Sequence, residues 1–350
     1  MMDFSLAESQ QAVAGLAAQV LAGTDPWKEL AQASLLDMSQ LHVLDTTVLL
    51  TEIGRHASPD SLKALATLMT GALPVVRWGS ADLQQALLPA VASGELILTA
   101  AIREPSNPAP AIPSTTVTDE KITGTKVGVP FAEQSHRILV PSSMIMNSSR
   151  QSAPKTVHDH GVAIVDPKAP GVRLIRTASS TGQPEYTLRM DQAPIESVLR
   201  PAECVSDLYN LAVAGACALI DGAVAGALAL TRDHVATREQ FGRPLAAFQA
   251  VSQQIADVYI ASRTLHLATL SACWRLAGEG TSDEGADLEV AGYWCAEQAP
   301  RTVRICHHLH GGLGMDVTYP LHRFSALVAD LVRFLGGADY RLERLACSPS

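Results

Sequence analysis

Apolar residues recur at helical spacing along roughly the first ninety residues of the chain. The first run follows Ser5–Glu8, which has the spacing of a capping box and predicts the start of a helix. Similar patterns cover residues 44–53, 62–68 and 83–91, and Gly, Pro and Ser residues separate them. This part of the chain is therefore predicted to be mostly helical.

The pattern changes near Gly94 to short runs that are rich in Ile, Val, Leu and Thr and are divided by Pro, Gly, Asn and Asp. Such runs predict strands. They cover residues 95–102, 121–129, 137–143, 161–167, 171–177 and 186–190. We expect a β domain that ends near Pro201 and contains a polar surface loop over residues 142–155.

Helical spacing returns after Ser206 in four long segments, which cover residues 207–238, 248–278, 288–309 and 320–335. Four long helices with short connections favour a bundle. The predicted fold is α+β, with an N-terminal helical domain over residues 1–94, a middle β domain over residues 95–203 and a C-terminal four-helix bundle over residues 204–350.

Composition limits the classes of partner. Of the 350 residues, 47% are hydrophobic, which is enough for a large core. The net charge of -9 and the absence of a long Lys/Arg run argue against nucleic acid, because phosphate backbones bind to clustered cations. The stretch 208–231 is interrupted by Asp221 and built largely from Ala and Gly, so we expect helix packing and no membrane span. The first residues lack the pattern of a secretory signal, and we expect a cytoplasmic protein.

The candidate metal ligands do not form a convincing set. The six cysteines contain no C-x-x-C pair and are expected to be buried, reduced thiols. His307 and His310 could share one face of a helix, but no Cys or carboxylate lies at ligand spacing, so we expect no metal. Alternatively, His307 packs or lies at the surface and His310 ends a helix, where the dipole favours a cation. A third alternative is that these histidines belong to a cofactor site, together with the following glycines.

Three motifs carry a resemblance to a known family. The segment 237–260 contains Arg-x-x-Phe-Gly, a Pro-Leu step and a Phe-Gln pair, and the segment 308–320 contains His-Leu-His-Gly-Gly followed by Tyr-Pro. The segment 80–105 ends in Glu-Pro. Together these motifs resemble those of the acyl-CoA dehydrogenase family. The resemblance implies an N-terminal helical domain, a β-barrel-like middle domain and a helical bundle, and a flavoenzyme that removes hydrogens from the α and β carbons of a CoA thioester.

The resemblance also implies a set of FAD contacts, made to a cofactor that a neighbouring subunit holds. They are Arg238, Gln240, Phe241, Leu245, Phe248, His308, Gly311 and Gly312. A guanidinium offers a planar donor fork to pyrophosphate oxygens, and paired glycines let backbone N–H groups approach an anion. Histidine stands at position 308 where the family has glutamine.

The family's catalytic base has no counterpart here. The family's glutamate precedes a Gly-Thr pair after the last bundle helix, and the matching residue is Leu335, which cannot accept a proton. Some relatives carry the glutamate near the position of Ala212, but residues 208–220 contain no carboxylate. The expected flavin-binding turn after Glu104 reads "SNPAPAIPS", whose prolines remove backbone donors, and residues 127–130 lack the family's hydroxyl. We therefore expect no catalytic residue in this chain.

These features resemble the smaller, base-lacking subunit of actinobacterial heterotetrameric acyl-CoA dehydrogenases that act on steroid side chains. This implies an α2β2 complex with a second subunit that carries the glutamate, an acyl-CoA substrate, FAD as the cofactor and an electron-transfer flavoprotein as the acceptor. The chain alone should then be inactive. One alternative is a self-sufficient homo-oligomer with Asp316 as an unusual base, although an acid after a Gly turn is more often a helix N-cap. Another is a flavin-free scaffolding protein of the same fold.

Overall fold

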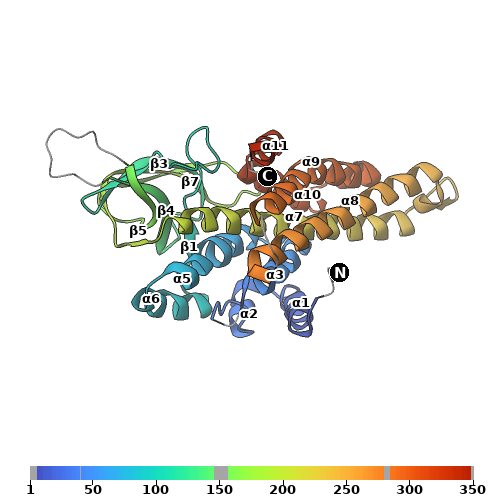
Figure 1. Cartoon of the computed structure of the whole chain (residues 1–350). Helices are drawn as coiled ribbons and strands as arrows, with labels where there is room; N and C mark the ends of the chain where they lie inside the picture. The colour runs from blue at the N-terminus through green and yellow to red at the C-terminus, as the bar shows by residue number, and fades with distance from the viewer. Residues whose placement is uncertain (1–5, 40, 146–156, 280–283, 348–350) are drawn as a thin grey trace. The chain divides into compact units, whose positions relative to one another are not determined.

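The computed structural model describes residues 6–39, 41–145, 157–279 and 284–347. They fall into two compact units. The helical unit contains the described residues of 1–24, 43–61 and 213–350, and the β unit contains those of 25–42 and 62–212. The α+β fold, with helical N- and C-terminal regions and a central sheet, is confirmed (Figure 1). The division into domains 1–94, 95–203 and 204–350 stays a prediction.

The helical unit is a bundle in which α9 packs against α8, α10 and α11. Its helices are α1 (Glu8–Val20), α3 (Val43–Arg55), most of α7 (Glu203–Thr237), α8 (Gln249–Trp274), α9 (Glu284–His310), α10 (Leu321–Leu335) and α11 (Ala338–Cys347). Small residues let α3 and α7 approach closely, because a Cβ at Gly222 would lie 1.9 Å from the carbonyl oxygen of Thr51. In α10 the apolar side chains lie on one face, and Leu321, Leu331 and Leu335 are fully buried.

The four long C-terminal helices predicted from the sequence are present, whereas the start of the first helix of the chain differs from the prediction. The first helix begins at Glu8 with Ala7 at the N-cap position, where the side chain of Gln10 accepts from the Ala7 N–H. The N-cap position is thus Ala7, and Ser5 lies outside the described residues. The final helix α11 was not predicted, because its ten residues give few turns over which a period can stand out.

The β unit is built around one eight-stranded sheet. Its strands are β1 (Leu98–Ala100), β2 (Thr116–Thr118), β3 (Lys121–Pro130), β4 (Arg137–Ile145), β5 (Val157–Val165), β6 (Val172–Thr177), β7 (Glu185–Pro194) and β8 (Ser197–Leu199). Their order is β6-β7-β3-β2-β4-β5-β8, with β1 pairing parallel to β4. Alternating residues such as Ile122, Ile138, Val140 and Leu188 form its apolar core. The short strands β2 and β8 were not predicted, since three residues give too little periodicity.

Helices also belong to the β unit. They are α2 (Pro26–Gln32), the end of α4 (Ser61–Ala64), the π-helix η1 (Leu65–Ala72), α5 (Leu73–Trp78), α6 (Ala81–Ala92) and the start of α7. The predicted polar loop over residues 142–155 is wrong at its start, because residues 142–145 continue β4 with Ser142 and Ser143 buried. The remainder, residues 146–155, lies outside the described residues.

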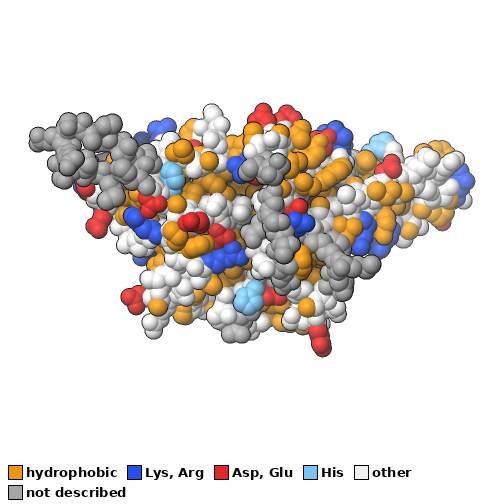
Figure 2. All heavy atoms as spheres, in the orientation of Figure 1, with side chains coloured by type: hydrophobic (Ala, Val, Ile, Leu, Met, Phe, Trp, Pro, Cys, Tyr) orange, Lys and Arg blue, Asp and Glu red, His pale blue; other side chains and the backbone are white. Residues whose placement is uncertain are grey.

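The apolar helix α7 is a core element. It is long and apolar enough to cross a membrane, but 89% of its most apolar window is buried inside the protein. Five cysteines are buried as expected, whereas Cys347 is exposed, so the expectation of buried thiols is wrong at that position. On the face drawn in Figure 2, acidic and basic side chains are interspersed with apolar ones.

Candidate functional site

A cleft of about 930 Å³ lies in the helical unit, where the end of α7, the start of α8 and the end of α9 meet. Six of the eight residues predicted to contact FAD line it, although they come from segments about seventy positions apart in the sequence. They are Arg238, Gln240, Leu245, His308, Gly311 and Gly312. Phe241 and Phe248 are not among its lining residues. Their role, like that of the other six, stays a prediction.

A short hairpin carries the first group of these residues. Strands β9 (Glu239–Gln240) and β10 (Arg243–Pro244) pair antiparallel, and the 3-10 turn η2 (Leu245–Ala247) follows them. The two turn residues have positive φ, 55° at Phe241 and 78° at Gly242, as a tight two-residue hairpin requires. The hairpin leaves Phe241 92% exposed, with its ring edge toward Phe248 at 6.2 Å between centroids. The turn therefore presents an aromatic ring away from the core of its own subunit.

The glycine turn closes the opposite side of the cleft. Helix α9 ends at His310, and the 3-10 turn η4 (Gly311–Met315) begins with Gly311 at φ 57°. A Cβ built on Gly311 or Gly312 would meet no atom within 4 Å, and both residues are exposed. Gly312 is therefore not required by packing inside this chain. The open turn leaves its backbone accessible to a ligand.

The histidines of this segment have separate roles. His307 is held by Gly314, whose carbonyl lies 2.9 Å from Nδ1, and by Ser325, whose hydroxyl lies 3.0 Å from Nε2. His308 is exposed at the cleft. His310 ends α9, as one alternative expected, and it is buried, so burial lowers its pKa and disfavours a cation there. Within the described ranges no group of three or more His, Cys, Asp or Glu residues could hold a metal ion.

The sequence reasoning missed His234, which also lines the cleft. Its ring stacks on that of His310 with centroids 4.4 Å apart and an angle of 17° between the planes. Burial, and then the positive charge of Arg238, lower its pKa. The available signal was its spacing, because His234 precedes Arg238 by four residues, and the Arg238 N–H donates to the His234 carbonyl at the end of α7.

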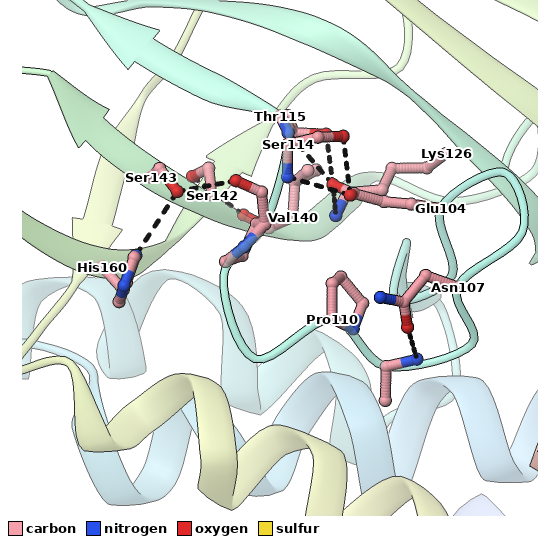
Figure 3. Close-up of polar contacts among 12 residues, drawn as sticks. Glu104, Asn107, Pro110, Ser114, Thr115, Lys126, Val140, Ser142, Ser143 and His160 are labelled. Carbon is pink, nitrogen blue, oxygen red and sulfur yellow. Dashed lines mark hydrogen bonds and ion pairs between the residues drawn. The ribbon is translucent and has the colours of Figure 1, made fainter. Parts of the chain in front are cut away.

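The β unit contains a second polar cluster, around Glu104 (Figure 3). Its carboxylate accepts hydrogen bonds from the backbone N–H and the hydroxyl of both Ser114 and Thr115, at 2.6–3.0 Å, and from Lys126 at 2.8 Å. Burial alone would raise the pKa of Glu104, but the hydrogen bonds from Lys126 and Ser114 lower it to about 2. Burial lowers the pKa of Lys126 to about 8 against the opposing effect of Glu104.

This cluster ties down both ends of the proline-rich segment that follows Glu104. The carboxylate holds Ser114 at the far end, while the backbone N–H of Glu104 donates to the carbonyl of Asn107 at 2.9 Å. The side chain of Asn107 accepts from the N–H of Ala109. Polar groups of this segment are thus used for internal hydrogen bonds.

None of the buried carboxylates that the structure describes is free to act as a base. There are four of them, and each is paired with a cation or a histidine: Glu104 with Lys126, Asp221 with His266, Glu289 with Arg341 and Arg344, and Asp330 with Arg333. Leu335 and Ala212, which stand where the family carries its base, are buried apolar residues. The carbonyl of Leu335 accepts from Nε of Arg341 at 2.7 Å.

Asp316 lies on the surface, in a turn that it stabilises itself. Its Oδ1 accepts from the backbone N–H and the hydroxyl of Thr318, each at 2.8 Å, and these bonds lower its pKa. It is not the N-cap of α10, which begins at Leu321 with Pro320 at the cap position. A carboxylate with a lowered pKa is a weaker proton acceptor.

Comparisons with known proteins agree with this architecture. The family model described as acyl-CoA dehydrogenase, C-terminal domain, matches residues 210–344. Acyl-CoA dehydrogenase FadE28 of Mycobacterium tuberculosis is 43% identical, over 98% of both chains. A variant of the Tcur3481-Tcur3483 steroid ACAD has a TM-score of 0.85 at 30% identity, with 97% of each chain covered. The ChsE4-ChsE5 complex of M. tuberculosis gives 0.86 at 26% identity, with 100% of each chain covered.

Proposed function

This chain belongs to the acyl-CoA dehydrogenase family, and from that premise we propose that it is the non-catalytic subunit of a heteromeric, FAD-dependent acyl-CoA dehydrogenase. It completes the FAD site of a second family member, which carries the catalytic glutamate, in an α2β2 complex. The substrate is a CoA thioester with a steroid side chain, as in cholesterol catabolism, the acceptor is an electron-transfer flavoprotein and the location is the cytoplasm. The names of the steroid ACAD and of the two-component ChsE4-ChsE5 complex support this choice of substrate and assembly.

The observation that carries the proposal is the gathering of Arg238, Gln240, His308 and the glycine turn around one cleft. Its volume of about 930 Å³ suits part of a dinucleotide. Arg238 is exposed and offers its planar donor fork at the rim. Gly311 and Gly312 leave the backbone open to an approaching anion. These residues fit the diphosphate and adenosine parts of FAD.

The β unit supplies the complementary argument. In this unit the segment after Glu104 is rich in proline and is anchored internally through Ser114 and Thr115. It therefore offers few backbone donors to a flavin of its own. We infer that this subunit lends groups to a cofactor seated in its partner.

The chemistry divides between the two subunits. FAD would supply the acceptor for the hydride of the thioester β carbon. Arg238 and the glycine turn would bind and orient its diphosphate, and Gln240, Leu245 and His308 line the same cleft. Removal of the α proton needs a carboxylate in contact with the substrate, and the partner provides it. This chain contributes cofactor binding and no proton transfer at the substrate.

The experiment compares the chain alone with the chain co-produced with a second acyl-CoA dehydrogenase family member that carries the catalytic glutamate. The chain alone should be nearly colourless and inactive, and the complex yellow and active. In the complex, Arg238→Ala should release flavin. Arg232→Ala is the matched control, because Arg232 lies six residues before Arg238, in the last turns of α7, is exposed and pairs with Asp233. A yellow, active homo-oligomer would refute the proposal, and unchanged flavin retention in Arg238→Ala would favour a scaffolding role.

A further inference from the structure

Two stacked imidazoles form part of the cleft wall. His234 comes from α7 and His310 from the last residue of α9, and their rings lie almost parallel with centroids 4.4 Å apart. The cleft is lined by both residues and by Arg238. Neither His234 nor His310 is among the residues assigned above to FAD binding.

The carbonyl of Cys306 fixes the hydrogen on one ring nitrogen of His310. Nδ1 lies 2.8 Å from this carbonyl oxygen, which can only accept, so Nδ1 carries a hydrogen. Nε2 lies 3.1 Å from the hydroxyl of Tyr319, which can donate to this nitrogen when the ring is neutral. Burial and the neighbouring His234 and His307 lower the pKa of His310, in agreement with a neutral ring. His310 is therefore a fixed, uncharged platform.

His234 differs from His310 in that its ring nitrogens have no hydrogen-bond partner within the described residues. It is only half-buried, and it lies one helical turn before Arg238. The groups that face this pair are Arg238 just after α7, His307 on α9 and Tyr319, and the nearby acid is Asp233, which acts on Tyr319. The local charge is thus weakly positive, and an anion is the partner that these groups favour.

We propose that His234 is a further contact for the dinucleotide diphosphate in this cleft, donating a hydrogen bond beside Arg238 as an imidazolium, and that His310 is the positioning residue that holds its ring by stacking. This inference rests on the proposed function. No bond is made or broken in this step. A proton from solvent is taken up by the imidazole of His234 when the anion binds, and it is released when the anion leaves.

Binding of FAD and protonation of His234 favour each other, so the affinity for FAD should depend on pH. In the empty cleft, burial and Arg238 lower the pKa of His234. Two phosphate charges beside the ring favour its charged form and raise that pKa in the filled cleft. Affinity for FAD is therefore greatest at pH values where the imidazolium of His234 is present. It weakens as the pH rises from the pKa of His234 in the empty cleft to its pKa in the filled cleft. Uptake of one proton allows at most about a tenfold change in affinity for each pH unit.

The test is a titration of the flavin-free complex with FAD, followed by flavin fluorescence, at about pH 6 and about pH 8.5. The unchanged complex should bind several-fold more weakly at the higher pH. His234→Phe keeps a stacking ring without a proton, and His234→Gln keeps a donor without titration. Both variants should lose most of this pH dependence, and His234→Gln should retain more affinity than His234→Phe.

His310 needs variants that separate stacking from folding. His310→Phe keeps a ring under His234, whereas His310→Ala removes it, and both leave the hydroxyl of Tyr319 without its ring acceptor. We expect the pH dependence to persist in His310→Phe and to fall in His310→Ala. Equal loss in both variants would overturn the positioning role.

The same variants separate the role of His234 from the proposed function of the chain. If Arg238→Ala weakens FAD binding but both His234 variants keep the full pH dependence, the role of His234 is wrong and the proposed function stands. If Arg238→Ala and the His234 variants all bind FAD as the unchanged complex does, the cleft does not contact FAD and both proposals fail.

Discussion

The buried ion pair between Glu104 and Lys126 gives a sharp prediction about the stability of the β unit. Lys126 is fully buried and Glu104 is 5% exposed, so removal of either partner leaves a buried charge without its counter-ion. A substitution that breaks such a pair typically costs about 3–5 kcal/mol. In Lys126→Met four hydrogen bonds from Ser114 and Thr115 still reach the carboxylate, so we expect a cost near the lower end, about 3 kcal/mol.

The two single variants should respond to pH in opposite directions. In Lys126→Met, burial is no longer opposed by the ammonium, so the pKa of Glu104 rises and acid relieves the penalty by protonating the carboxylate. In Glu104→Gln, the pKa of Lys126, which is about 8 with its partner present, falls further and base relieves the penalty by deprotonating the amine. The double variant should recover about 2 kcal/mol relative to the sum of the single variants.

The measurement is urea unfolding of the full chain at about pH 5, pH 7 and pH 9. Lys121→Met is the matched control, because Lys121 lies on the same strand β3 but is exposed, and it should change the free energy of unfolding by less than about 0.5 kcal/mol. Single-variant costs below about 1 kcal/mol, or costs that change with pH in the same direction, would refute the electrostatic reasoning.

Three further predictions concern the helical unit. Gly222→Ala places a Cβ 1.9 Å from the carbonyl oxygen of Thr51 and should lower the free energy of unfolding by about 3 kcal/mol or more. In Gly15→Ala in α1 the new Cβ meets no atom within 4 Å, so this control should raise the free energy of unfolding by about 0.5–1 kcal/mol. Thermal unfolding of the two variants measures the difference. A maleimide should label Cys347 in the native protein and leave the buried thiols unlabelled until unfolding, as counted by mass spectrometry; early labelling of a second thiol would contradict the packing. Asp316→Asn should leave the turnover of the active complex within about twofold, and a large loss of kcat would restore Asp316 as a base.

Periodicity predicted the long elements because their burial is one-sided and extends over many turns. The helices α7, α8, α9 and α10 each contain enough turns for the apolar positions to stand out. Short elements carry no such signal. The two serines at the end of β4 look like loop residues in the sequence, yet both are buried in the strand, where Ser143 donates to the carbonyl of Pro113.

The cleft was predictable for a different reason. Arg238 and the pair Gly311-Gly312 were singled out by family motifs, and only the fold brings the two segments together. His234 belongs to no motif, and the stacking that links it to His310 joins residues on two different helices. The partners of a side chain across the bundle depend on helix packing, and spacing along one helix does not report them.

The resemblance matches Leu335 to the family's catalytic glutamate, and the residues around Leu335 decide what a carboxylate there would do. Leu335 is fully buried at the end of α10, and the two residues that follow it, Gly336 and Gly337, both have positive φ. Arg341 closes this turn by donating to the Leu335 carbonyl while it is itself held by Glu289. A glutamate at position 335 would therefore enter a buried apolar site, where burial would raise its pKa and the nearby guanidinium of Arg341 would lower it. The turn after α10 is held to α11 through Arg341, so a carboxylate at position 335 would also have to fit beside this contact.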